Sequence, residues 1–157
     1  MALSEKPILN RVRKINNLTM LIQPNQCTVF VQVWADVNSL KQGSTSGCYA
    51  VCNRSQDSTG EGTANLKTNV ISGSNVCWTV VPVDPQYADD FTITAVGAKS
   101  GWATPPAPVP DFPNTFTGKL ETGTVGGTVD SNIQFSYNGG SESITVTLPV
   151  VITPVEA

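Results

Sequence analysis

Hydrophobic and polar positions alternate in short runs along most of the chain, which is the pattern of β-strands with one buried face. The run from Cys27 to Val37 shows it best, since every second residue from Val29 to Ala35 is apolar. The opposite row of this run is mixed and includes Phe30, Gln32 and Trp34. We expect the apolar row to face the core, and the mixed row is a candidate for contact with a second surface.

The stretch from Leu66 to Val83 predicts two strands joined by a tight turn at Ser72-Gly73-Ser74-Asn75. Residues of the second strand are apolar on both faces, a pattern typical of a central strand that is covered on both sides. Trp78 lies in this strand and can bury roughly 200 Å². We therefore expect Trp78 to anchor the core.

Further short strands are predicted at Cys48–Cys52, Phe91–Val96 and within Phe116–Val125. The clearest hairpin is the last one, in which Ile133–Tyr137 and Ile144–Ile152 alternate on either side of Asn138-Gly139-Gly140. Pro149 and Pro154 suggest that its second strand runs along a sheet edge. Segments 38–47 and 53–63 are polar and are expected to be loops, and the five prolines of 101–114 predict a crossover between sheets.

These runs predict an all-β protein, an antiparallel β-sandwich of about 7–9 strands with immunoglobulin-like or jelly-roll topology. No window has convincing helical periodicity, and no repeat or composition break divides the chain. We expect residues 1–157 to form a single domain, with residues 1–16 as a candidate extended N-terminal arm.

Composition and charge narrow the classes of partner. Only 13% of the 157 residues are charged and the net charge is −3, which argues against nucleic-acid binding. No apolar run approaches the roughly 20 residues of a membrane span, and the N-terminus lacks the apolar region of a signal peptide. The expected location is therefore the cytoplasm, or a virion or filament assembled from it.

The chain contains no histidine, which excludes Ser-His-Asp and Cys-His catalysis as well as histidine-ligated metal sites. We therefore expect no enzymatic activity, no catalytic residues, no metal and no cofactor. The spacing of the cysteines matches no common zinc pattern. Buried free thiols are the expected state of all four cysteines, Cys27, Cys48, Cys52 and Cys77. In an oxidising compartment, a Cys27–Cys77 or Cys48–Cys77 disulfide is the alternative.

Two groups of side chains are candidates for binding. Basic residues near the N-terminus, including Arg11, Arg13 and Lys14, belong either to a solvated first strand or to an arm that docks on an acidic neighbouring subunit. Aromatic rings beside carboxylates are suited to sugar binding, because a ring stacks on a sugar face and a carboxylate accepts its hydroxyls.

The candidate ligand-binding residues of this second kind are Tyr87, Asp89, Asp90 and Trp102. Two alternatives stay open for them. Asp84, Asp89 and Asp90 could supply oxygens to a calcium ion or simply form a solvated turn, and Trp102 could plug one end of the sandwich.

The segment from Gly60-Glu61-Gly62 through Leu66, Gly73 and Val76 to Trp78 resembles the AidA/PixA inclusion-body protein family. That family has a Gly-x-Gly loop, a Leu strand and a Gly-Asp turn before Ile-x-Trp, and its last strand is similar to Val151-Ile152-Thr153-Pro154-Val155. The chain differs in having Ser74 at the Asp position and fewer aromatic residues before the last strand. The resemblance implies a cytoplasmic bacterial β-sandwich that accumulates or assembles, with lectin-like activity in some members.

Together these observations favour a non-enzymatic β-sandwich that acts by self-assembly or binding, as a homo-oligomer or a larger assembly. A lectin-like carbohydrate-binding module is the first alternative, and a structural protein of a virion or filament is the second.

Overall fold

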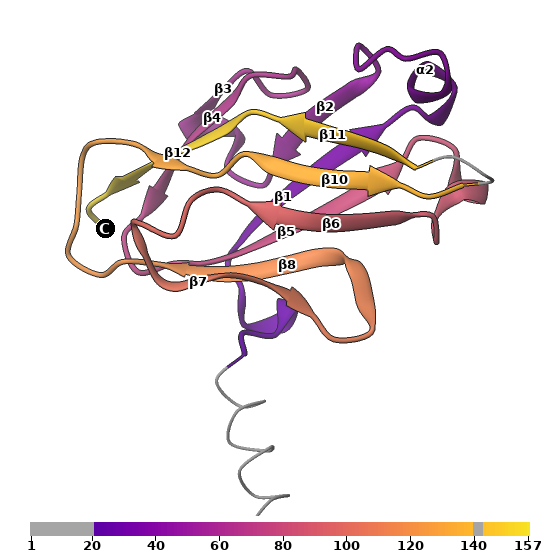
Figure 1. The fold of residues 1–157 in the computed structure, drawn as a ribbon. Helices are drawn as coiled ribbons and strands as arrows, with labels where there is room; N and C mark the ends of the chain where they lie inside the picture. Colours follow the sequence, from indigo (N-terminus) through magenta and orange to yellow (C-terminus); the bar gives the residue numbers. More distant parts are fainter. Residues whose placement is uncertain (1–20, 140–142) are drawn as a thin grey trace, which may run out of the picture.

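The fold was determined as a computed structural model, which describes residues 21–139 and 143–157 (Figure 1). Short strands dominate it, with one short α-helix and three 3-10 turns among the described residues. The helical elements are η1 (Pro24–Gln26), α2 (Val37–Lys41), η2 (Ser55–Asp57) and η3 (Pro85–Tyr87). The strands are β1 (Val29–Ala35), β2 (Cys48–Cys52), β3 (Ser58–Thr59), β4 (Leu66–Ile71), β5 (Asn75–Pro82), β6 (Phe91–Val96), β7 (Trp102–Val109), β8 (Phe112–Leu120), β9 (Val129–Asp130), β10 (Ile133–Tyr137), β11 (Ile144–Leu148) and β12 (Val150–Val155).

The strands form three sheets. The large sheet has the order β2-β1-β5-β8-β7, the β10 sheet has the order β11-β10-β6, and the β12 sheet has the order β3-β4-β12-β9. Figure 1 shows the β10 sheet in front of the large sheet, with the β12 sheet beside it. Buried side chains from all three sheets form one hydrophobic cluster, so one face of the large sheet, its inner face, is covered by the other two.

Trp78 lies at the centre of this cluster, as the sequence predicts. Its side chain is 0% exposed, and its indole Nε1 donates a hydrogen bond to Ser131 Oγ at 2.9 Å. The Trp102 ring packs edge-on against it, with 5.3 Å between the ring centroids. Strand β5, which carries Trp78, is central in the large sheet because β1 and β8 pair with it on either side.

The all-β prediction is confirmed, but the expectation of purely antiparallel sheets is wrong. Strand β1 runs parallel to β5, and β12 runs parallel to β4. The physical reason lies in the turn after Ile71: it carries the chain from one sheet to another, so β4 and β5 are not partners in a hairpin. The strands also outnumber the predicted seven to nine, and the 38–47 segment begins with helix α2.

The proline-rich segment is a strand rather than a crossover. Most of it forms β7, which pairs antiparallel with β8 at the edge of the large sheet. Its register shifts three times, as expected where Pro105, Pro106 and Pro108 remove backbone donors. The prolines do exclude the segment from the centre of a sheet, but an edge strand tolerates them.

The predicted C-terminal hairpin is confirmed for β10 and β11 and corrected beyond them. Pro149 ends β11, and β12 continues in a different sheet, between β4 and β9. The segment that the prolines suggested to be an edge is therefore central in the β12 sheet. This is possible because β12 supplies a parallel ladder to β4 and only a short antiparallel one to β9.

Candidate functional site

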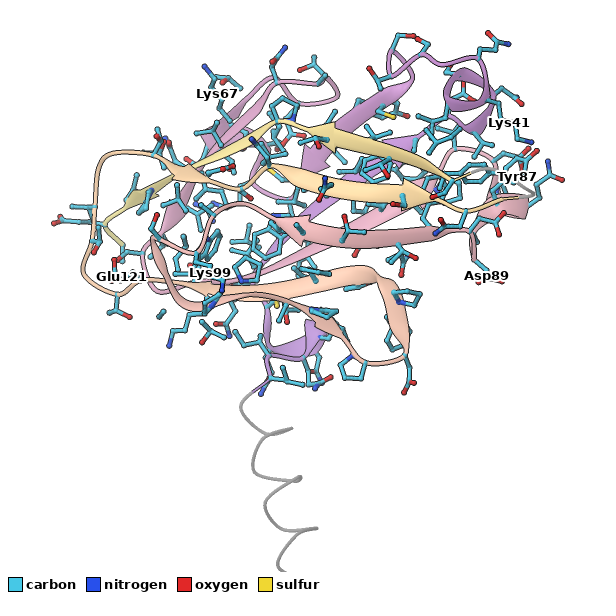
Figure 2. All side chains as sticks on the ribbon, viewed as in Figure 1. Lys41, Lys67, Tyr87, Asp89, Lys99 and Glu121 are labelled. Carbon is cyan, nitrogen blue, oxygen red and sulfur yellow. The ribbon has the colours of Figure 1, made fainter. Side chains whose placement is uncertain are left out.

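The predicted ligand-binding loop lies at one end of the molecule. Asp84 caps η3 by accepting from the backbone N–H of Gln86, and Tyr87 ends this turn. The Tyr87 ring is half-buried, packs edge-on to Tyr137 with 6.1 Å between centroids, and has Lys41 Nζ 5.2 Å from its centre. Figure 2 shows Lys41, Tyr87 and Asp89 close together at this end. The ring is therefore already in contact with the core on one side and a cation on another.

Trp102 does not join this loop. It begins β7, after the far end of β6, whereas Tyr87, Asp89 and Asp90 precede the near end of β6 (Figure 1). Its side chain is only 7% exposed, because it packs on Trp78. The structure thus brings Tyr87 near the two carboxylates and places Trp102 in the core, the alternative in which it plugs one end of the fold.

The carboxylates of that loop do not gather around a common point either. Both carboxylate oxygens of Asp84 accept hydrogen bonds from Gln86, and Asp89 is exposed. Within residues 21–139 and 143–157, no group of three cysteine, aspartate or glutamate side chains is placed to hold a metal ion. In the same part of the chain, no helix is both long enough and apolar enough to cross a bilayer.

A cleft of about 460 Å³ lies at the opposite end of the molecule, a size typical of small-ligand sites. It lies between the loop that follows β8 and the β12 sheet. Its walls are polar and apolar in about equal parts, and the polar side chains include Glu121, Thr124, Asp130 and Asn132. The label of Glu121 in Figure 2 marks this end, away from Tyr87.

A glycine in a left-handed conformation forms part of the cleft wall. Gly101 lines the wall with φ +91°, a conformation that disfavours other residues. A Cβ atom there would come within 3.0 Å of the Val129 side chain, which also lines the cleft. Both the backbone conformation and the tight contact with Val129 therefore favour glycine at this position.

The two carboxylates of the cleft keep free acceptor capacity. Glu121 Oε2 accepts from Thr124 Oγ1 at 3.3 Å, and Asp130 Oδ1 accepts from the backbone N–H of Asn132 at 2.9 Å. The salt bridge of the described chain, Arg54 to Asp57, lies elsewhere. The second carboxylate oxygens of Glu121 and Asp130 can thus accept hydrogen bonds from ligand hydroxyls. The sequence does not indicate this site, because Glu121 and Asp130 belong to no motif.

All four cysteines are free thiols, and Cys52 is the one that is half-buried rather than buried. Burial raises the pKa of the Cys27 thiol to about 12 and that of Cys48 to about 11. Burial also raises the pKa of Cys52, with a further contribution from Glu61, whose carboxylate accepts from the Cys52 thiol. Thiols with raised pKa values are poor nucleophiles at neutral pH, so nothing here activates a cysteine for catalysis.

Both edges of the large sheet are closed to strand addition. At the β2 edge, Ala50 N–H donates to Thr63 O at 3.0 Å and Cys52 N–H donates to the Glu61 carboxylate at 3.0 Å. At the other edge, the prolines of β7 leave few backbone donors. Strand addition at these edges is therefore disfavoured, and a face of the sheet is the more favourable contact surface.

The outer face of the large sheet, opposite the core, presents an apolar surface. Its open part is formed by β1, β2 and the end of β5, where strand alternation places five apolar side chains on the same face. Among these five side chains, Phe30 is 38% exposed and the other four are half-buried. We call this surface the outer patch: Phe30, Trp34, Tyr49, Val51 and Val81. It includes Phe30 and Trp34 of the mixed row that the sequence marks as a candidate contact surface.

The predicted assembly residues Arg11, Arg13 and Lys14 lie outside the described residues, so their part in a contact stays a prediction. The described chain begins at Leu21, immediately before η1.

The fold and these surfaces define an all-β protein with a cleft that contains two carboxylates and with an open apolar face. The chain belongs to the family described as a domain of unknown function (DUF8788), whose model matches residues 27–143. No curated protein matches the sequence.

Among solved structures, the chain is similar to the crystal structure of the inclusion body protein PixA from Burkholderia cenocepacia J2315. The two share 12% sequence identity and a TM-score of 0.54, over 87% of this chain and 100% of that chain. At this identity the likeness concerns the fold, and it supports the resemblance to the AidA/PixA family that the sequence indicates.

Proposed function

We propose that this protein is a non-enzymatic β-sandwich protein of the cytoplasm that acts by self-assembly. The observation that carries the proposal is the outer patch, in which Phe30 keeps 38% of its surface exposed on the same sheet face as half-buried Trp34 and Tyr49. Several large apolar side chains left accessible on one sheet face are typical of an interaction site. Aromatic residues are enriched at such interfaces because they bury much area with few rotatable bonds.

Two further observations support the proposal. PixA, the protein of similar fold, is an inclusion body protein, and accumulation in such bodies requires contacts between copies. The packing of side chains from three sheets into one cluster supports a β-sandwich, with the immunoglobulin-like or jelly-roll topology that the sequence suggests. The chemistry of the chain is consistent with a binding role, since the thiols are held protonated and histidine is absent.

The experiment is sedimentation velocity and light scattering of the full chain over a wide concentration range. We expect species of several chains that dissociate on dilution. A single monomeric species at millimolar concentration would overturn self-assembly.

The cleft supports a second candidate function, binding of a carbohydrate. Its volume of about 460 Å³ fits one or two sugar rings, and the free oxygens of Glu121 and Asp130 are suited to accept hydroxyl groups. The loop predicted from the sequence, at Tyr87, Asp89 and Asp90, is the competing location.

A glycan array followed by titration with two variants separates the locations. We expect Glu121→Gln to weaken binding and Asp89→Asn to leave it unchanged if the cleft is the site, and the reverse if the loop is the site. Glu156→Gln, at the exposed C-terminus, is the control. The absence of any glycan ligand would remove this candidate.

A further inference from the structure

The first described residues lie across the outer face of the large sheet. Thr117 Oγ1 on β8 donates to the carbonyl oxygen of Ile22 at 2.6 Å, and Asn75 Nδ2 on β5 donates to that of Gln26 at 3.0 Å. As a result, Cys77 and Thr117 are buried although they belong to the outer face. Residues 21–27 therefore cover the β5 and β8 part of this face and leave the outer patch, on β1 and β2, open.

The direction in which residues 21–27 run shows whether the N-terminal segment leads toward the outer patch of its own molecule. Cys27 precedes β1, whereas Ile22 contacts β8, which lies two strands further along the sheet. Followed toward the N-terminus, the chain thus moves away from its own outer patch. In Figure 1 the segment before β1 lies beside β7 and β8, in agreement with the hydrogen bond to Thr117. Residues 1–20 would have to reverse direction to reach the patch of the same molecule.

The sequence of residues 1–20 is suited to an apolar surface on an acidic partner. Its apolar side chains include Ile8, Leu9, Val12, Ile15, Leu18 and Met20. Four basic residues and one acidic residue give this segment a net charge of +3, and since the whole chain carries −3, residues 21–157 carry −6. Opposite charges favour the encounter of this segment with the body of another copy. Twenty residues can also span roughly 66 Å when extended, more than enough to cross to a neighbour.

We propose that residues 1–20 of one copy dock on the outer patch of a second copy, an inference that rests on the self-assembly proposed above and names the contact that produces it. The apolar side chains of the segment cover Phe30, Trp34 and Val51, and its basic side chains remain at the rim. The closed edges of the large sheet are consistent with docking on the face. Because each copy offers one segment and one patch that do not coincide, the contact is head-to-tail and propagates from copy to copy.

The test uses two full-length variants that each lose one half of the contact. The segment variant carries Ile8→Ser, Val12→Ser and Ile15→Ser, and the patch variant carries Phe30→Ser and Val51→Ser. Val125→Ser, which alters an exposed apolar residue outside the patch, is the control. Circular dichroism verifies that each variant is folded, and Trp34→Phe replaces the patch variant if that one unfolds.

In sedimentation velocity, we expect each variant alone to associate at least about tenfold more weakly than the wild type, as loss of buried anchors predicts. An equimolar mixture of the two variants should form a heterodimer and nothing larger, because only one intact segment and one intact patch can meet. The control should assemble like the wild type. In addition, iodide quenching of Trp34 should fall on mixing, while Trp78 and Trp102 are buried and contribute little.

The outcomes distinguish this inference from the proposed function. A wild type that stays monomeric overturns both. A wild type that assembles together with variants that assemble equally well overturns only the docking of residues 1–20. Variants that stay monomeric when mixed also overturn it. Greater iodide quenching in the segment variant, at concentrations where the wild type is monomeric, would show that the segment covers the patch of its own chain.

Discussion

Strand β1 presents apolar residues to both faces of the large sheet, yet the two faces differ in burial. On the inner face, Val31 and Val33 are fully buried, and the neighbouring Trp78 is enclosed by strands of the other sheets. On the outer face, Phe30 remains 38% exposed, and only the β5 and β8 side is covered, by residues 21–27.

The difference teaches that similar side chains on one strand serve different purposes. The inner face has partners within the described chain, so its side chains stabilise the fold. The outer patch has none within that part of the chain, so its side chains are available for contacts. The following substitutions separate the two roles, from the largest expected effect to the smallest.

Trp78→Ala and Trp34→Ala compare the faces directly. We expect Trp78→Ala to lower the free energy of unfolding by about 3–5 kcal/mol, because it empties the core and leaves Ser131 unpartnered. Trp34→Ala should cost less than about half of that, since this side chain is half-buried. Urea unfolding followed by circular dichroism measures both. Equal losses would mean that the outer face is also part of the folding core.

Ser131→Ala examines the polar contact of the inner face. The substitution leaves the buried Trp78 Nε1 without its acceptor, so we expect a loss of about 1–3 kcal/mol. Ser100→Ala, at an exposed serine, is the matched control and should change the free energy of unfolding by less than about 0.5 kcal/mol. A neutral Ser131→Ala variant would show that the indole finds another acceptor.

Thr117→Val examines the cover of the outer face. The substitution removes the hydrogen bond to Ile22 and should lower the free energy of unfolding by about 0.5–1.5 kcal/mol. Hydrogen exchange should accelerate at the backbone amides of Gln26 and Cys27, which close η1. Thr115→Val is the control, since Thr115 Oγ1 donates only to neighbouring Asn114. Unchanged exchange would indicate that other contacts hold residues 21–27 in place.

The buried thiols predict a dependence of stability on pH. The folded pKa of Cys27, about 12, lies above its ordinary value of 9.0, so the folded state holds this proton where the unfolded state loses it. The contribution is complete below pH 9 and is lost as the pH rises from 9 toward 12. We expect the urea midpoint to fall between pH 8.5 and 10.5 and to fall less in Cys27→Ala. An identical slope in both proteins would assign the dependence to other groups.

Particular residues show how far the sequence could be interpreted. Period-two alternation located β1, β6, β10 and β11, because a strand with one buried face must alternate, and the turn residues 72–75 separated β4 from β5. Apolar residues on both sides of Trp78 placed β5 at the centre of a sheet. The pairing of β1 with β5 and of β12 with β4 could not be predicted, since alternation is the same for parallel and antiparallel neighbours.

The candidate sites divide in the same way. Tyr87, Asp89 and Asp90 are neighbours in sequence and remain near each other in the structure, whereas Trp102 was grouped with them only by residue type. The cleft is lined by Gly101, Glu121 and Asp130, which lie far apart in the sequence. No spacing rule predicts that they line the same cleft.

The sequence by itself determined the all-β class, the burial of Trp78 and the lack of histidine chemistry, because composition and alternation act locally along the chain. Only the tertiary structure decided which strands pair, that the proline-rich segment becomes an edge strand, and which apolar face is left open. These depend on contacts between residues far apart in sequence, where the free energy is set by how whole surfaces fit together.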